Sequence, residues 1–424
     1  MSRRVDLEIT RLGARGDGIG NLDGAPVYVP FTLPGEKVTA VVSADRAGTL
    51  RAEKVEIITP AAARQAPVCR HFGVCGGCAA QHMTPLSARA WKRQVIIGAL
   101  ARKGLAGEAV AEVAGLPSGG RRRATFSAWR TAGRAAIGFM GRASHRPVAI
   151  DRCPVLEPAL EALLPALVGL CGQLLENGER GSLGLCRADN GVDLVIGHRR
   201  SPRLADLRFL ADFATQHDIA RISWCRNKGT PEIIVARMAP MVRCGTVDVA
   251  LPPGAFLQAS RAGQDALSMI VTDAARDARK VLDLFSGIGT FSFPLAGTAA
   301  VTAVDSSTES IGAISAAART HSGIKAVEAS VRDLFASPYP LADNDYYDTV
   351  IFDPPRAGAR RQAVEIGRSR VRTVIAVSCN PSTLARDLRI LVDAHYDIET
   401  IIPVDQFGHA AHIEAVAVLR KSTL

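Results

Sequence analysis

Long hydrophobic runs are missing from this chain of 424 residues. No apolar stretch approaches the roughly 18 residues that a membrane-spanning helix needs. The opening residues, MSRRVDLEITRLG, have no apolar core, so neither a secretory signal nor a membrane anchor is expected. Aromatic residues are scarce at 5%, but the hydrophobic share of 47% is ordinary for globular proteins and excludes wholesale disorder. These features predict a cytoplasmic globular protein with two or three domains.

Acidic residues are outnumbered by basic ones. Asp and Glu total 41 against 51 Lys and Arg, which gives a net charge of +10 and an isoelectric point near 9.4. A solvated basic surface explains such a balance as readily as a polyanionic partner does. The segment 121–146 favours RNA, because it lacks acids and interleaves three aromatic residues with seven arginines, namely Phe126, Trp129 and Phe139 with Arg121, Arg122, Arg123, Arg130, Arg134, Arg142 and Arg146. We therefore predict that this segment faces RNA.

Disulfides are not expected in a reducing cytoplasm, so clustered cysteines indicate metal ligands or nucleophiles. Three of the nine cysteines, Cys69, Cys75 and Cys78, lie in the run CRHFGVCGGC, and Cys153 in DRCP is the candidate fourth ligand. Zinc and an iron-sulfur cluster both suit four thiolates. Four further cysteines, in apolar or strand-like settings, are interpreted as small core residues: Cys171, Cys186, Cys225 and Cys244.

Three regions differ in their pattern of apolar residues. Residues 1–60 contain short strands and an Asp-Gly hairpin pair at 23–24, which predict a small closed barrel of the OB type. Residues 61–250 are predicted to form an α+β domain with several strands and one apolar helix near 158–175. Residues 251–424 alternate strands with helices, which is typical of a parallel, doubly wound sheet.

A helix with well-marked ends follows the cysteine run. Thr84 is a good N-cap, Pro85 suits the first turn, and Gly104 ends the apolar pattern. We expect this helix, 84–104, to pack on the C-terminal domain.

The third glycine of a dinucleotide fingerprint is missing from the C-terminal region, which disfavours NAD. Its first strand ends at Asp283 and is followed by Gly287 and Gly289. The next strand ends in Asp305, 22 residues after Asp283, where a carboxylate can accept both ribose hydroxyls of an adenosine. This order suits S-adenosylmethionine, which has no pyrophosphate, although a tight packing turn alone would also explain the glycines. Asp333, after the third strand, is a candidate partner for the adenine amino group.

Two more strands bring polar side chains to the same edge. In FDPPRAG, two prolines fix the turn that follows Asp353, although an aspartate often only starts a turn. In VSCNP, Cys379 lies on the turn before a helix, whose amino terminus is expected to lower the pKa of the thiol and favour a nucleophilic thiolate. A buried small side chain is the alternative for Cys379. Ligands of such sheets bind at the carboxyl ends of the strands, so we predict the active site there.

With these motifs the chain resembles the bacterial 23S ribosomal RNA (uracil-5)-methyltransferases over nearly its full length. RLGARGDGIGNLDGAPVYVPFTLPGE is similar to a TRAM domain, and CRHFGVCGGC is similar to the family's cluster loop. DLFSGIGTFSFPLA, FDPPRAG, SCNP and HIEAVAVLRK match its cofactor, acid, nucleophile and base motifs in order. The resemblance implies an α/β fold: a Rossmann-like class I methyltransferase domain, an OB-like TRAM β-barrel and an α+β iron-sulfur middle domain. It also implies a 4Fe-4S cluster held by Cys69, Cys75, Cys78 and Cys153.

The resemblance also assigns roles in the reaction. Cys379 is expected to add to C6 of uracil, and Glu414 to remove the C5 proton after methyl transfer from S-adenosylmethionine. The expected cofactor-binding residues are Gln258, Phe285, Gly287, Asp305, Asp333 and Asp353. The substrate is expected to be an unpaired or flipped uridine of ribosomal RNA, and the protein to act as a monomer.

Two positions depart from the family pattern. Ser260 stands where the family usually has an asparagine, two residues after Gln258, so its role does not carry over. Gly408 follows Phe407 where the family tends to have proline, which predicts a more mobile loop before Glu414.

Three alternatives follow from the same residues. A transfer RNA substrate is the nearest, but that branch of the family resembles a shorter chain without the barrel and the four cysteines. An RNA cytosine-5 methyltransferase would have a Pro-Cys pair where this chain has Pro354-Pro355. A non-catalytic RNA-binding iron-sulfur protein would not explain Cys379 together with Glu414.

Overall fold

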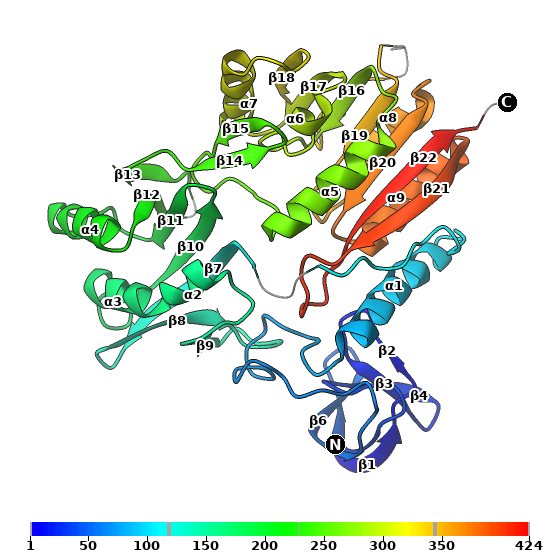
Figure 1. Ribbon diagram of the computed structural model, residues 1–424. Helices are drawn as coiled ribbons and strands as arrows, with labels where there is room; N and C mark the ends of the chain where they lie inside the picture. Colours follow the sequence, from blue (N-terminus) through cyan, green and yellow to red (C-terminus); the bar gives the residue numbers. More distant parts are fainter. Residues whose placement is uncertain (1, 117–119, 228, 342–345, 423–424) are drawn as a thin grey trace.

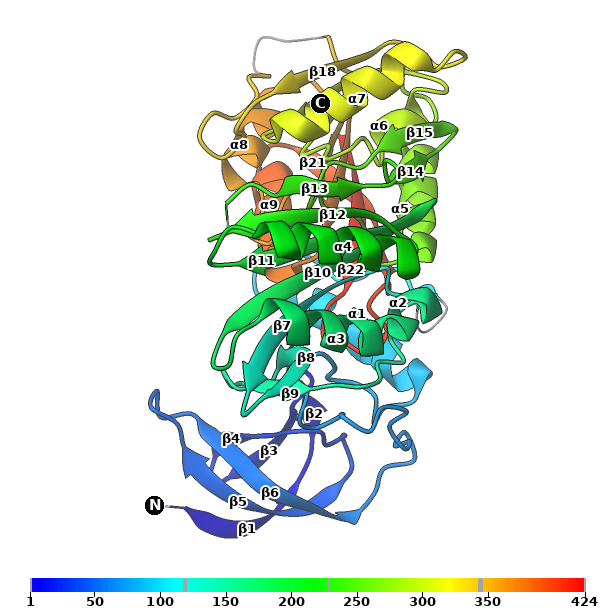
Figure 2. The same cartoon turned by 90° about the vertical axis from the view of Figure 1, so that its left-hand side faces the viewer.

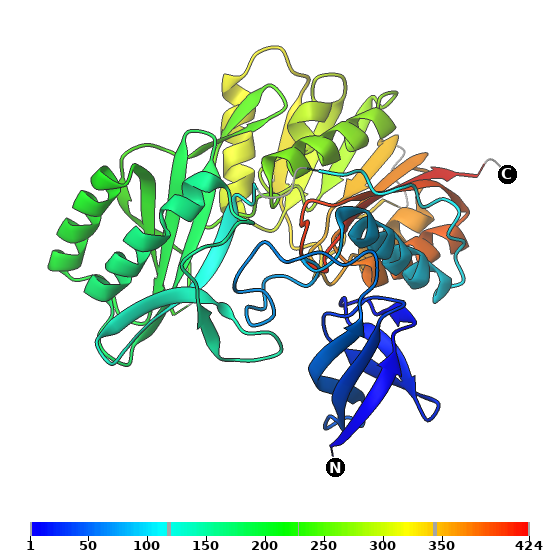
Figure 3. The same cartoon turned by 60° about the horizontal axis from the view of Figure 1, so that its bottom comes forward.

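The computed structural model describes residues 2–116, 120–227, 229–341 and 346–422. Its strands form one large sheet in each of the three sequence regions, and a two-stranded ribbon joins the second to the third (Figure 1). The middle and C-terminal sheets lie side by side, and the N-terminal sheet lies below them in the view of Figure 3. The predicted α/β fold class, with a small β domain at the N-terminus, is confirmed.

Six strands form the N-terminal sheet, in the order β1-β5-β6-β4-β3-β2. They are β1 (Arg3–Glu8), β2 (Arg11–Leu12), β3 (Gly18–Leu22), β4 (Ala25–Val29), β5 (Lys37–Ala44) and β6 (Leu50–Thr59). Alternate apolar side chains such as Val5, Leu7 and Val42 face one core. The turn between β3 and β4 places Asp23 at φ 53° and Gly24 at φ 85°, the left-handed conformations that a two-residue hairpin needs. The predicted hairpin is confirmed.

Helix α1 (Pro85–Ala101) connects the N-terminal sheet to the rest of the molecule. The Thr84 hydroxyl accepts a hydrogen bond from the Ser87 backbone N–H at 3.4 Å, so the predicted N-cap is confirmed. Trp91 Nε1 donates to the Gly13 carbonyl at 2.9 Å, which ties the helix to the N-terminal domain. Farther along, Ile96 and Leu100 belong to the same apolar core as the C-terminal sheet.

The middle region forms a seven-stranded sheet in the order β13-β12-β11-β10-β7-β8-β9. Its strands are β7 (Arg123–Thr131), β8 (Arg134–Met140), β9 (Pro147–Ala149), β10 (Arg180–Ala188), β11 (Gly191–His198), β12 (Ile219–Arg226) and β13 (Glu232–Ala236). Helices α2 (Pro158–Ala162), α3 (Leu164–Leu174) and α4 (Leu204–Gln216) share a core with this sheet. In Figure 2, α3 and α4 lie in front of it, so one face is covered by helices.

The expectation of one apolar helix in the middle region is wrong. Helix α4 is amphipathic, with Leu210 and Phe213 buried and Arg208 exposed on solvent, so a search for an apolar run does not find it. It connects β11 to the parallel strand β12 as a crossover helix.

The C-terminal sheet has the order β18-β17-β16-β19-β20-β22-β21. Its strands are β16 (Lys280–Leu284), β17 (Ala300–Asp305), β18 (Val327–Val331), β19 (Thr349–Phe352), β20 (Thr373–Ser378), β21 (Tyr396–Val404) and β22 (Glu414–Lys421). Helices α5 (Arg261–Ala274), α6 (Ser292–Leu295) and α7 (Thr308–Thr320) cover one face, and α8 (Arg360–Arg368), α9 (Pro381–Asp393) and α1 cover the other. The ribbon β14 (Met241–Cys244) and β15 (Val247–Ala250) precedes α5.

One strand contradicts the predicted all-parallel sheet. β22 runs antiparallel to both β20 and β21. A loop rather than a crossover helix connects β21 to β22, and such a connection reverses the chain direction. This reversal brings the start of β22 to the end of β20. No helix in the described part of the chain is both long and apolar enough to cross a membrane.

Candidate active site

The glycine turn after β16 and the acid after β17 form one structural unit. The Gly287 N–H donates to Asp305 Oδ2 at 2.9 Å, and the Ser307 N–H donates to Asp305 Oδ1 at the same distance. Phe285 and Gly287 both have positive φ, at 62° and 54°, and a Cβ on Gly287 would meet nothing within 4 Å. A non-glycine residue in this conformation is strained, and such strain is concentrated at functional sites. The turn therefore exposes backbone beside a fixed carboxylate.

Asp333 lies next to this turn. Its Oδ1 accepts hydrogen bonds from the backbone N–H groups of Phe335 and Ala336, at 2.9 and 3.1 Å. The Phe335 ring is 5.5 Å from the Phe285 ring and the residue is 45% exposed. Sequence reasoning missed Phe335, although a large apolar residue within a polar turn was a usable signal. The two rings offer an apolar wall to a flat ligand.

Asp283 has a structural position rather than a ligand-binding one. It is fully buried, and the Ser292 hydroxyl donates to its Oδ2 at 2.6 Å. Burial raises its pKa to about 7. It holds the first turn of α6 behind the glycine loop.

Cys379 and Glu414 are neighbours across two strands. Ser378 of β20 pairs with Ala415 of β22 in the antiparallel register, so the next positions, Cys379 and Glu414, face each other at the sheet edge. Asn380 Oδ1 caps α9 by accepting from the Ser382 N–H at 3.1 Å, which fixes the backbone immediately after the cysteine. Sequence analysis named both residues but had no means of pairing them, because it expected a parallel sheet.

The surroundings of Cys379 overturn the expected low pKa of its thiol. Burial raises this pKa to about 11, and the carboxyl groups of Glu414 and Asp353 act in the same direction. Arg356 lowers it by a smaller amount. The amino terminus of α9 does not outweigh these effects, so the thiol is protonated at neutral pH in the free protein.

A chain of side-chain amides connects the two carboxyl groups. Gln258 Nε2 donates to Asp353 Oδ2 at 3.4 Å, and Gln258 Oε1 accepts from Gln406 Nε2 at 2.8 Å. Gln406 Nε2 also donates to Glu414 Oε1 at 3.3 Å. Burial raises the pKa of both Asp353 and Glu414, and the charge of Asp353 raises that of Glu414 further. Sequence analysis found Gln258, Asp353 and Glu414 but missed Gln406.

The loop before Glu414, residues 405–413, is held from two sides. Lys92 of α1 is buried, and its Nζ pairs with Asp405 Oδ1 at 2.6 Å and donates to the Gly408 carbonyl at 2.8 Å. The backbone N–H groups of Ala79 and Ala80 both donate to the His409 carbonyl, at 2.8 and 2.9 Å. Gly408 has φ 47°, which proline cannot adopt. The departure at Gly408 therefore comes with a set of bonds that hold the loop, and its greater mobility stays a prediction.

Ser260, which stands where the family usually has an asparagine, caps the amino terminus of α5. Its hydroxyl accepts from the Gly263 N–H at 3.0 Å and caps α5. His412, in the motif before the last strand, accepts from Arg356 Nη2 at 2.7 Å through Nε2. Burial and the nearby Arg356 lower the pKa of His412 to about 4, so it is neutral.

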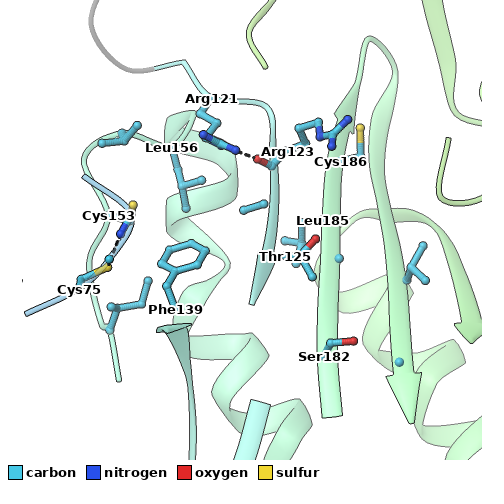
Figure 4. Close-up of a pocket in the computed structure, with 18 of the residues that line it drawn as sticks. Cys75, Arg121, Arg123, Thr125, Phe139, Cys153, Leu156, Ser182, Leu185 and Cys186 are labelled. Carbon is cyan, nitrogen blue, oxygen red and sulfur yellow. Dashed lines mark hydrogen bonds between the residues drawn. The ribbon is translucent and has the colours of Figure 1, made fainter. Parts of the chain in front are cut away.

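The four cysteines line a cavity of about 1240 Å³ between the cysteine run and the uncovered face of the middle sheet. Cys75 forms an isolated antiparallel β-bridge with Gly141, just after β8. Figure 4 shows Cys75 and Cys153 on the same side of the cavity. Within the described residues, no three His, Cys, Asp or Glu side chains are arranged as ligands of a single metal ion. The predicted ligands therefore converge on one cavity without forming a single-ion site.

The arginine-rich segment is less exposed than its composition suggested. Arg122 is only 2% exposed, and its guanidinium donates to the Gln258 carbonyl at 3.1 Å and to Gln264 Oε1 at 2.6 Å. Arg130 donates to the backbone carbonyls of Gly172 in α3 and of Leu175, just after α3. Phe126 lies in the core of the middle domain. The prediction that the whole segment faces RNA is wrong for these residues. Alternate side chains of β7 point into the protein, and Arg122, just before β7, is buried against the C-terminal domain.

Other arginines gather around the cavity instead. Arg121 and Arg123 lie at its upper edge in Figure 4, and the Arg123 guanidinium stacks 4.3 Å from the exposed Phe256 ring. The cavity is also lined by Arg152, Arg180 and Arg199. Asp193 lines it as well, but Arg221 neutralises Asp193 with two bonds, at 2.8 and 2.9 Å. The cavity is therefore strongly basic.

Comparisons with known proteins agree with this architecture. A model of the tRNA (Uracil-5-)-methyltransferase family matches residues 252–422, and a model of the TRAM domain matches residues 2–55. An uncharacterized RNA methyltransferase of Caulobacter vibrioides is 41% identical over 98% of this chain and 100% of its own length. The 23S rRNA (uracil(1939)-C(5))-methyltransferase RlmD of Halomonas elongata is 35% identical over 98% of this chain and 89% of its own. The chain belongs to the RNA (uracil-5)-methyltransferase family.

A solved structure from this family has the same overall arrangement. The tRNA (uracil-54, C5)-methyltransferase of Pyrococcus abyssi, in complex with S-adenosyl-L-homocysteine, is similar with a TM-score of 0.75 and 25% identity. The match covers 97% of this chain and 99% of that one, so the matched region includes the N-terminal domain. An enzyme named for a transfer RNA substrate therefore has this length and architecture. The expectation that the N-terminal barrel separates ribosomal from transfer RNA substrates is wrong.

Proposed function

We propose that the protein transfers a methyl group from S-adenosylmethionine to C5 of a uridine in 23S ribosomal RNA. The observation that carries this proposal is the pairing of Cys379 with Glu414 where β20 ends and β22 begins, beside Asp353. A nucleophile and a carboxyl group on opposite strands suit a reaction in which one adds to a base and the other removes a proton. The identity to the RlmD protein supports ribosomal RNA as the substrate.

We propose that the cofactor lies along the turn after β16. Phe285 and Phe335 would flank the adenine, Asp333 would accept from its amino group, and Asp305 would accept from the ribose hydroxyls beside Gly287. The open space beside Gly287, where an added Cβ would meet no atom within 4 Å, leaves room for the cofactor. When bound there, S-adenosylmethionine supplies an electrophilic methyl group. Its reactive end would then face Gln258 and Asp353.

The chemistry of uracil requires a nucleophile and a base. C5 of uracil is too weak a nucleophile for direct methylation, so the Cys379 thiol would give up its proton to solvent and bond to C6, leaving the electron pair on C5 and O4 as an enolate. C5 would then take the methyl group, with S-adenosylhomocysteine as the leaving group. Glu414 would remove the C5 proton, which re-forms the C5–C6 double bond and expels the Cys379 thiolate. Asp353 would orient the base and the cofactor end.

We propose that the basic cavity binds the RNA strand next to the target. Arg180 and Arg199 are exposed on strand ends and suit phosphate contacts, and Phe256 with Arg123 offers a stacking surface. The target uridine must leave its stack before both of its faces can be reached, so an unpaired or flipped uridine fits best. The protein would act as a monomer in the cytoplasm, where ribosomal RNA is made.

We propose that Cys69, Cys75, Cys78 and Cys153 hold a 4Fe-4S cluster. Two observations support it: the cysteine run resembles the family's cluster loop, and all four residues line one cavity. The ligands of a four-iron cluster bind different irons and stand farther apart than those of one zinc ion. The cluster would hold the cysteine run against β8 and the loop before Glu414.

A transfer RNA substrate is the second candidate, favoured by the similarity to the Pyrococcus abyssi enzyme. The test incubates the purified chain with methyl-labelled S-adenosylmethionine and unmodified transcripts of 23S ribosomal RNA or of transfer RNA. We expect label in 5-methyluridine of the ribosomal transcript. Label in the transfer RNA alone would favour the second candidate, and label in 5-methylcytidine would contradict both.

The proposed roles of Cys379 and Glu414 are separated by two substitutions. Cys379→Ala should abolish methylation and form no covalent complex, because the enolate is never generated. In Glu414→Gln, Cys379 should still add to C6 and C5 should still take the methyl group, but the C5 proton is not removed. A methylated RNA-protein adduct should therefore accumulate and be visible on denaturing gels. Normal turnover by Cys379→Ala would contradict the nucleophile. Release of methylated RNA by Glu414→Gln without an adduct would move the base elsewhere, and His412 would be tested next.

A further inference from the structure

Gln406, which no sequence motif singled out, lies between the two carboxyl groups of the site. It is 8% exposed, and its Oε1 accepts a hydrogen bond from the Ala259 backbone N–H at 2.9 Å. A backbone amide can only donate, so this bond fixes which end of the Gln406 side chain is oxygen. Its Nε2 must therefore point away from Ala259, towards Gln258 and Glu414.

The orientation of the Gln406 amide determines the orientation of the Gln258 amide. Gln406 Nε2 donates to Gln258 Oε1 at 2.8 Å, so Gln258 must turn its own Nε2 towards Asp353 Oδ2, at 3.4 Å. One hydrogen of Gln258 Nε2 is used by Asp353, and the other is available to a ligand. A single backbone N–H thus determines that the site presents an N–H donor from Gln258 beside the carboxylate acceptor of Asp353.

Gln406 packs tightly against Gly263 of α5. A Cβ added to Gly263 of α5 would lie 2.6 Å from both Cβ and Oε1 of Gln406, so any larger residue there would displace it. The preceding residue, Asp405, is held by the buried Lys92 at 2.6 Å. Helix α5 therefore confines the Gln406 side chain, and α1 holds the residue that precedes it.

We propose that Gln406 is a positioning residue that makes the site selective for uracil over cytosine. The inference rests on the proposed function. Uracil presents a carbonyl acceptor at C4 beside an N3–H donor, which matches a donor from Gln258 and an acceptor from Asp353. Cytosine presents the reverse, an amino donor beside an N3 acceptor, and would leave buried groups unpaired. Gln406 enforces this match by preventing rotation of the Gln258 amide.

The test replaces Gln406 with methionine, which has a similar length but makes no hydrogen bond. Gln362→Met is the matched control, because Gln362 is also buried and lies on α8 outside the site. It bonds to the backbone of Tyr339 through both ends of its amide, at 2.7 and 3.1 Å. The substrates are two RNA oligonucleotides around the mapped target, with uridine or cytidine at that position. The readout is the ratio between the inhibition constant of the cytidine RNA and the KM of the uridine RNA.

For Gln406→Met we expect this ratio to fall at least about tenfold. The control should keep the ratio of the unchanged protein. An unchanged ratio in folded Gln406→Met would overturn the inference, and so would an equal fall in Gln362→Met, because the effect would then be structural.

Gln406→Glu gives a second test that does not depend on the methionine variant folding. It keeps the acceptor for Ala259 but replaces the Nε2 donor with an oxygen, which favours rotation of the Gln258 amide. The ratio should again fall, and an unchanged ratio would overturn the inference. A chain with unchanged sequence that methylates no uridine RNA would instead contradict the proposed function itself.

Discussion

At the scale of single residues, the main feature of the site is a nucleophile that is protonated at rest. Burial and two neighbouring carboxyl groups hold the Cys379 thiol above its ordinary pKa. A mostly protonated thiol reacts slowly with adventitious electrophiles, because only its small thiolate fraction is nucleophilic.

The raised thiol pKa predicts a pH dependence of alkylation. Because the thiolate is the reactive form and the folded pKa is about 11, the rate of iodoacetamide alkylation of Cys379 should rise about tenfold per pH unit between about pH 6 and pH 9, without a plateau. The rate is measured by mass spectrometry of the peptide containing Cys379, with a free thiol of ordinary pKa as reference. A plateau near neutral pH would show that the helix amino terminus dominates after all.

At the scale of helices and strands, α1 connects the N-terminal domain to the loop that precedes Glu414. Its buried Lys92 pairs with Asp405, whose neighbour Gln406 contacts Glu414. The helix itself follows from its sequence, since Thr84 and Pro85 mark its start. Its function as a support does not, because the partner Asp405 lies 313 residues away in the chain.

Replacing Lys92 should therefore loosen the loop. Lys92→Met leaves the buried Asp405 without its partner, which typically costs about 3–5 kcal/mol. We expect a lower thermal midpoint and faster hydrogen exchange in residues 405–413. The double variant Lys92→Met with Asp405→Asn should recover part of the loss, because no buried charge is left unpaired. Equal stability of Lys92→Met and the unchanged chain would mean that the loop is held by Ala79 and Ala80 alone.

The strand β7 shows where sequence reasoning succeeded and where it failed. Composition identified a basic segment but treated its arginines as equivalent. The alternation of the strand buries Phe126 and places Arg123 on the cavity face, whereas Arg122, just before the strand, is buried by its bonds to Gln258 and Gln264. Gln406 could not be found in this way, since it lies in a loop and its contacts come from distant parts of the chain.

This difference predicts two kinds of arginine variant. Replacing Arg180 and Arg199 with alanine should weaken RNA binding and reduce the slope of log affinity against log salt by about one to two, because up to two phosphate contacts are lost. Arg122→Ala should instead lower thermal stability and leave the slope unchanged, because it unpairs Gln264 and the Gln258 carbonyl. Fluorescence anisotropy at several salt concentrations measures both. An unchanged slope in the double variant would make the cavity arginines a solvated surface.

At the scale of the whole molecule, the cysteine run joins all three regions. The Gly76 N–H donates to the Met140 carbonyl at 2.9 Å in the middle domain, and Ala79 and Ala80 hold the C-terminal loop. The Phe72 ring of the run lies 4.8 Å from the Phe31 ring of the N-terminal domain. The run has little regular secondary structure of its own, so its conformation depends on its contacts with the three regions.

The proposed cluster predicts both a metal content and a loss of order on its removal. Protein purified without oxygen should be brown and contain about four irons per chain. Cys75→Ser should lose iron and increase hydrogen exchange in β8 and in residues 405–413, because the cysteine run holds both. Cys225→Ser is the matched control, since Cys225 also lines the cavity but lies outside the proposed ligand set. Colourless protein with one zinc per chain, or full iron content in Cys75→Ser, would contradict the assignment. If iron is lost but exchange does not change, the cysteine run is fixed by its backbone bonds alone.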